Sequence, residues 1–263
     1  MPESRLIFCS VLWQTASMQT RLWLIFGVSL IVGAALVLAG VVAAETRERN
    51  YWVDGECDPI LIFLLEFFDG VTPPALPSGW SSTTWVTSNS GVPMPPADTL
   101  PNAVFVDDPA TVSDKQLLSP NIAPVCDAGA VQVFFRNNFN LQDGFDGGVL
   151  EISFDDGQTF QDVLVAGGTF VVGGYNGTIN SCCGNPLAGR QAWTGNSGGF
   201  IDSMVSLPAG CSQFILRWRM GSDSSVAGEG WRVDDVGITQ CFTPSRRVPD
   251  PRPRPTPHAR PSP

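Results

Sequence analysis

Hydrophobic and polar residues alternate along the central part of the chain with the two-residue period of β-strands. The segments 131–136 (VQVFFR), 150–154 (LEISF) and 214–220 (FILRWRM) place apolar residues at alternate positions. This alternation predicts strands with one buried face and one solvent-exposed face. Turns rich in Gly, Pro and Asn separate the runs. No segment after residue 44 keeps a helical period, so the predicted class is all-β.

Strands of this kind are buried most simply between two packed antiparallel sheets. The pattern extends over residues 61–242, which suits an antiparallel jelly-roll β-sandwich of eight or more strands. Residues 45–60 form a short polar linker in front of this domain. Residues 243–263 are rich in Pro and Arg and contain little to bury, so we expect a disordered, extended tail that acts as a spacer.

The N-terminal segment 1–44 predicts export. Residues 22–44 form an uncharged apolar run long enough for a membrane-spanning helix. Val42 and Ala44 are small residues at the positions that signal peptidase reads, so the segment is either a cleaved signal peptide or a retained signal anchor. The start is either Met1 or Met18. In both cases the domain is expected to be secreted or at the cell surface.

Charge and composition exclude several classes of function. The formal net charge is −10, and the segment from Asp54 to Ser245 has 21 acidic and six basic side chains, a net of −15. A nucleic-acid binder built on positive charge is therefore excluded. The single histidine, His258, lies in the tail, which argues against histidine metal sites and Ser-His-Asp catalysis. The acidic excess is compatible with calcium binding and equally with a solvated acidic surface.

Six cysteines follow the leader, and an even number in an exported protein predicts disulfides. Position alone suggests the pairs Cys57–Cys241 and Cys126–Cys211. The adjacent residues Cys182 and Cys183 fit no zinc-binding spacing.

Two local patterns predict particular backbone features. The run from Ser153 to Phe160 has the S-x-D-x-G-x-T-F pattern of an Asp-box hairpin, whose side chains fasten a turn to its own backbone. In the segment 231–238, Trp231 and Val233 share one face of a strand whereas Val236 and Ile238 share the other. A β-bulge near Asp234 and Asp235 would reconcile the two sets.

Several of these segments together resemble the MAM-like jelly-roll modules of exported bacterial proteins, as found in immune inhibitor A-type metalloproteases and in adhesins. The resemblance implies a concanavalin-like or galactose-binding-like fold and an accessory or adhesive role without catalysis. The matching segments are 68–80 (FDGVTPPALPSGW), 146–153 (DGGVLEIS), 173–177 (GGYNG), 187–193 (LAGRQAW), 216–219 (LRWR) and 230–234 (GWRVD).

The resemblance also implies a calcium site. In related jelly rolls an acidic residue of the first strand and an aspartate of the last strand approach each other and can hold Ca²⁺. The matching positions are Glu66 or Asp69 in the first strand, with Asp234 or Asp235 in the last. No other cofactor is expected.

These features favour a non-catalytic binding or adhesion module whose partner is an extracellular glycan or a protein surface. Trp85, Tyr175 and Trp193 are the candidates for stacking on a ligand, provided that their rings are exposed. Nucleic acid is not an expected partner, and a membrane would be contacted only through an uncleaved leader. Two alternatives remain: a glycosidase, because the strand at Glu151 is similar to part of a laminarinase-type motif, and a purely structural spacer.

Overall fold

A computed structural model describes residues 60–126, 128–210 and 212–241 of the chain. The predicted leader and tail, and all but the last residue of the linker, lie outside these ranges. Thirteen strands are described, and no residue among them is helical. Within these ranges no helix is long and apolar enough to cross a membrane. The strands are β1 (Ile60–Glu66), β2 (Val86–Ser88), β3 (Ala103–Val106), β4 (Ser113–Leu118), β5 (Val131–Asn140), β6 (Gly147–Ser153), β7 (Gln161–Asp162), β8 (Thr169–Val172), β9 (Gly177–Thr178), β10 (Gln191–Ala192), β11 (Ile201–Leu207), β12 (Ile215–Ser222) and β13 (Gly230–Cys241).

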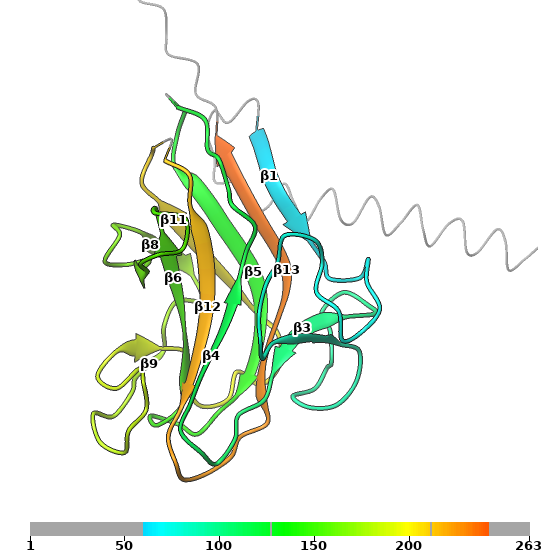
Figure 1. The fold of residues 1–263 in the computed structure, drawn as a ribbon, viewed down its shortest axis with the longest axis vertical. Helices are drawn as coiled ribbons and strands as arrows, with labels where there is room; N and C mark the ends of the chain where they lie inside the picture. Colours follow the sequence, from blue (N-terminus) through cyan, green and yellow to red (C-terminus); the bar gives the residue numbers. More distant parts are fainter. Residues whose placement is uncertain (1–59, 127, 211, 242–263) are drawn as a thin grey trace, which may run out of the picture. The chain divides into compact units, whose positions relative to one another are not determined.

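The strands form two large antiparallel sheets that face each other, as Figure 1 shows. One sheet has the order β2-β3-β13-β5-β11-β8, with β1 also paired to β13. The other has the order β4-β12-β6-β7, and β9 and β10 make a small separate hairpin. The predicted all-β class and antiparallel sheets are therefore confirmed.

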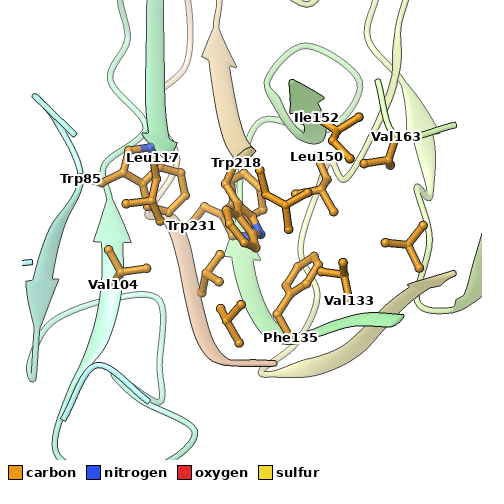
Figure 2. Close-up of a cluster of buried hydrophobic side chains, with 14 of the residues drawn as sticks. Trp85, Val104, Leu117, Val133, Phe135, Leu150, Ile152, Val163, Trp218 and Trp231 are labelled. Carbon is orange, nitrogen blue, oxygen red and sulfur yellow. The ribbon is translucent and has the colours of Figure 1, made fainter. Parts of the chain in front are cut away.

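The core lies between the two sheets and is built around aromatic rings (Figure 2). The ring of Trp218 on β12 lies 5.5 Å from that of Phe135 on the facing strand β5. Close packing of Trp231 against β6 requires a glycine, because a Cβ on Gly148 would overlap the indole ring. All five tryptophans of the described residues are buried, and aromatic side chains bury more apolar area than most others.

The alternation predicted for 150–154 is only partly correct. Leu150 and Ile152 are in the core as expected, but Phe154 follows the end of β6 and its side chain is 50% exposed. Glu151 and Ser153, predicted on the solvent face, are buried. Glu151 is covered by arginine side chains and Ser153 by its own turn, so polar neighbours rather than the core remove them from water.

The predicted bulge in β13 is confirmed. The register between β13 and β5 shifts between Asp234 and Gly237, and Asp235 has a φ of 48°. Trp231 and Val236, which regular alternation would place on opposite faces, are consequently both in the core.

The Asp-box turn is also confirmed. Asp155 accepts hydrogen bonds from the backbone nitrogen of Thr159 at 2.9 Å and from its hydroxyl at 2.6 Å. The hydroxyl of Ser153 accepts one from Gly157 N at 2.9 Å. These bonds hold the pKa of Asp155 down at about 2. The box therefore fastens the connection from β6 to β7.

Four cysteines of the described residues are disulfide-bonded. Cys182 and Cys183 form a disulfide with each other in an exposed loop, a pair that the sequence did not predict. Cys126 and Cys241 are also disulfide-bonded. Cys57 and Cys211, their predicted partners, lie outside the described residues, so these two pairings remain predictions.

Candidate functional site

The two tryptophans predicted to stack on a ligand are buried. The side chain of Trp85 is 1% exposed and that of Trp193 is 0% exposed. Their rings pack edge-on against other core rings, Trp85 on Trp231 at 5.2 Å and Trp193 on Phe135 at 5.6 Å. Stacking on a sugar needs an open ring face. The prediction is therefore wrong for Trp85 and Trp193, whose bulk fills the core.

Tyr175 is half-buried and fastens a loop to strand β6. Its hydroxyl accepts a hydrogen bond from Leu150 N at 3.0 Å and lies 3.1 Å from both Leu150 O and Asp162 Oδ2. Burial, followed by the charge of Asp162, raises the pKa of the hydroxyl well above its usual value. The ring packs on Trp193. The structure gives Tyr175 a packing role, and ligand contact by its ring remains a prediction.

The exposed aromatic residues are different ones. Among the described aromatic residues, Phe67 and Phe154 are the large exposed rings, at 46% and 50%. Phe154 borders a cavity of about 190 Å³ at one end of the sandwich. The cavity has no titratable side chain among its described lining residues, which include Pro124, Val131, Leu207, Pro208 and Phe214. Such a site can bind an apolar surface but offers no acid, base or charged nucleophile.

Two elements fix the position of Phe154 beside this cavity. Strand β6 ends at the preceding residue, and the fastened Asp-box turn begins immediately after it. The ring of Phe214, just before β12, packs edge-on against Phe154 at 6.5 Å. The sequence signal for this exposure was present, since a turn motif follows the last alternating residue directly. The alternation alone placed Phe154 on the buried face.

The four carboxylates predicted to hold calcium do not form one group. The register pairs Glu66 with Val236, so the first and last strands do approach. Glu66 Oε1 nevertheless accepts from Phe68 N at 2.8 Å, and Asp69 Oδ1 accepts from Asn102 N at 2.9 Å. No set of three or more Asp, Glu, His or Cys side chains in the described ranges is arranged as a metal site. Calcium binding at these positions remains a prediction.

Asp234 and Asp235 instead organise the loop before β3. Asp234 Oδ2 accepts hydrogen bonds from the backbone nitrogens of Asp98 and Thr99 at 2.8 and 3.1 Å. Asp235 Oδ1 accepts one from the Thr99 hydroxyl at 2.7 Å. Burial, followed by the charge of Asp235, raises the pKa of Asp234 to about 8. Burial also raises the pKa of Asp235 to about 6. The bulge thus aims both carboxyl groups at protein donors.

Glu151, the residue on which a glycosidase would depend, is enclosed by arginines. Arg190 Nη1 donates to its Oε1, and Arg217 Nε donates to its Oε2 at 2.6 Å. Arg219 approaches the same carboxylate at 3.5 Å, and the side chain of Glu151 is 3% exposed. A retaining glycosidase needs two carboxyl groups that reach the substrate. Glu151 has both oxygens occupied, and Asp155 is fastened in its turn.

Comparisons with known proteins give structural likeness but no family. No protein-family model and no curated protein sequence matches the chain. The K2 cleaved adhesin domain of Lys-gingipain matches with a TM-score of 0.39 and 18% identity, covering 66% of this chain and 98% of its own. A xylan-binding domain of the CBM 22 class matches with a TM-score of 0.40 and 9% identity. The match covers 71% of this chain and 98% of that domain. Part of an arabinose-bound α-L-arabinofuranosidase matches with a TM-score of 0.38 and 12% identity. The match covers 68% of this chain and 27% of the arabinofuranosidase chain.

These solved structures are an adhesin domain, a carbohydrate-binding module and a stretch of a glycosidase. TM-scores of 0.38 to 0.40 assign neither a family nor a ligand to this chain. The MAM-like resemblance is not confirmed by any family match.

Proposed function

We propose that this protein is a non-catalytic binding module, secreted or held at the cell surface, that contacts a carbohydrate through the cavity beside Phe154. The single observation that carries the proposal is the exposed ring of Phe154 in the lining of an apolar cavity. Aromatic and apolar side chains are the predominant lining of small-molecule binding sites.

The chemistry of the cavity favours a sugar ring as the occupant. The C–H face of a pyranose is apolar and stacks on an aromatic ring, whereas its hydroxyl groups stay hydrated at the rim. A cavity of about 190 Å³ has room for one such ring, and its described lining carries no charge that a charged ligand would require. An apolar side chain of a protein partner is the other occupant that this chemistry admits.

The surroundings of Glu151 and of the cavity support a role without catalysis. Glu151 is committed to arginines, and the cavity beside Phe154 has no titratable group among its described lining residues. General acid–base hydrolysis needs a carboxyl group within reach of the glycosidic oxygen. We therefore infer that the protein retains its ligand unchanged. The disulfides support an oxidising location, in line with the predicted leader.

A glycan array probed with the full-length protein tests the proposal. We expect binding to a subset of glycans and a loss of about 2 kcal/mol, or roughly 30-fold in affinity, in Phe154→Ala. Phe67→Ala is the matched control, because Phe67 has a similar exposed fraction and lies outside the cavity lining. Glycan binding that is equally strong in Phe154→Ala, or release of hydrolysed glycan, would contradict the proposal.

A further inference from the structure

Three buried aspartates meet at the end of the sandwich opposite Phe154. Asp108 follows β3, Asp146 immediately precedes β6, and Asp223 follows β12. Phe154 follows the far end of the same strand β6. The side chain of Asp146 is 0% exposed, and those of Asp108 and Asp223 are each 2% exposed.

Each carboxylate has one satisfied oxygen and one that is free of hydrogen bonds. Asp146 Oδ1 accepts from Asp223 N at 2.6 Å, which links two of the loops. Asp108 Oδ2 accepts from Gly228 N at 3.1 Å, and Asp223 Oδ1 accepts from Ser225 N at 2.7 Å. The remaining oxygens, Asp108 Oδ1, Asp146 Oδ2 and Asp223 Oδ2, are buried without a hydrogen-bond partner.

No positive charge compensates these groups. None of the three pairs with a Lys or Arg of the described residues, and the nearby Lys115 is committed to Asp107 at 2.7 Å. The charge of Asp146 acts on Asp108, and the charge of Asp223 acts on Asp146, each as a repulsion between like charges. Burying a negative charge without a compensating positive charge costs free energy. At neutral pH these carboxylates must therefore bind either a proton or a cation.

The backbone approaches the aspartates closely at Gly228. Gly228 lies so close to Asp108 and to the carbonyl of Asn140 that a Cβ at this position would overlap both. Ca²⁺ takes six to eight oxygen ligands from carboxylates, carbonyls and water in flexible geometry. Mg²⁺ requires a near-ideal octahedron and gives up its water reluctantly, so it suits such a set of ligands less than Ca²⁺ does.

We propose that Asp108, Asp146 and Asp223 bind one Ca²⁺ ion through their buried free oxygens and thereby tie together the loops after β3, before β6 and after β12. The three side chains are not already arranged as a complete metal site, so binding draws the free oxygens toward a common point. This site is separate from Glu66, Asp69, Asp234 and Asp235, and it is independent of the cavity beside Phe154.

Thermal unfolding of the full chain, with CaCl₂ or with EDTA, tests the proposal. A ligand that binds only the folded state raises the melting temperature, by about 5–10 °C at a hundredfold excess over its dissociation constant. We expect this shift in the natural protein and its loss in Asp146→Asn. Asn keeps the shape of Asp but removes one buried charge, so in EDTA the variant should melt at or above the natural protein.

Two controls separate this site from other acidic groups. Asp156→Asn changes an exposed aspartate and should keep the calcium-dependent shift. Asp234→Asn should also keep it, and its loss there would move the site to the residues implied by the resemblance and overturn the proposal. If Asp146→Asn does not fold, Asp223→Asn takes its place, and calorimetric titration with CaCl₂ measures binding to the natural protein directly.

Two results would overturn the calcium proposal. A melting temperature that responds to pH but not to CaCl₂ would mean that a shared proton neutralises the three aspartates, and the cation would be rejected. A calcium shift that survives in both Asp146→Asn and Asp223→Asn would equally overturn the proposal.

Discussion

Arg217 and Glu151 are directly opposite each other on the paired strands β12 and β6, and Arg217 Nε donates to Glu151 Oε2 at 2.6 Å. Arg190 occupies the other oxygen of Glu151 and also binds Asp162 at 2.8 Å. Arg217 packs in turn on the ring of Phe160, 3.9 Å from its centroid. Glu151, on which the glycosidase alternative depends, is therefore the shared partner of an ion-pair network with Arg190 and Arg217.

Glu151→Gln is expected to weaken folding. The change leaves three arginines around a neutral amide, and loss of one partner of a largely buried ion pair costs roughly 1.5–3 kcal/mol. Urea unfolding measures this cost. Asp114→Asn removes the partner of Arg219, a pair whose aspartate side chain is 35% exposed, and should cost less than about 1 kcal/mol. Equal costs in the two variants would contradict a structural role for Glu151.

Gly148→Ala tests the contact between the two sheets. The added Cβ would overlap the ring of Trp231 on the facing sheet, and an overpacked core costs about 1–3 kcal/mol. Gly70→Ala is the matched control, because nothing lies within 4 Å of a Cβ at that position. We expect a lower unfolding free energy in Gly148→Ala and little change in Gly70→Ala. Two variants of equal stability would show that β6 and β13 are not packed as described.

Stability in EDTA should fall as pH rises from about 5 to about 8. The pKa values of Asp108, Asp234 and Asp235 are raised to about 7, about 8 and about 6, against about 3.9 in an unfolded chain. In this range the folded state holds more protons than the unfolded state, so the unfolding free energy declines with pH. Each unit by which a raised pKa exceeds the starting pH contributes about 1.4 kcal/mol, so the three groups together predict a decline of several kcal/mol.

Other aspartates do not mask this trend. Asp155 and Asp114 have lowered pKa values, so the stability they contribute is present above about pH 4 and is lost only as pH falls below it. Urea unfolding at several pH values measures how the unfolding free energy changes with pH. A free energy that rises steadily from pH 5 to 8 would contradict the raised pKa values of the buried aspartates.

The alternation of apolar residues predicted the sandwich correctly because each sheet has one face on a common core. Strand β12 follows the pattern from Ile215 to Met220, with Leu216 and Trp218 buried and Arg217 at the polar face. The bulge at Asp234 was also predictable, because two sets of core residues in β13 are out of phase. These features depend on neighbours along the strand, which a sequence displays directly.

The site residues were less predictable because exposure depends on the whole fold. Trp193 lies in a loop segment by sequence, yet its ring is enclosed by Phe135 and Phe170 from other strands. Phe154 was assigned to the core by alternation, yet its strand ends one residue earlier. Asp108, Asp146 and Asp223 are far apart in the chain and belong to no local motif, so only the strand pairing brings them together.

Mapping of the bound glycan by nuclear magnetic resonance tests the central claim most directly. A glycan selected on the array is added to isotope-labelled protein, and the shifts of backbone amides are followed. The account predicts that the largest changes cluster at Phe154, Leu207 and Phe214, with the glycan recovered intact. Changes centred on Glu151 and Arg217, or a shortened glycan, would contradict a binding module that works through the apolar cavity.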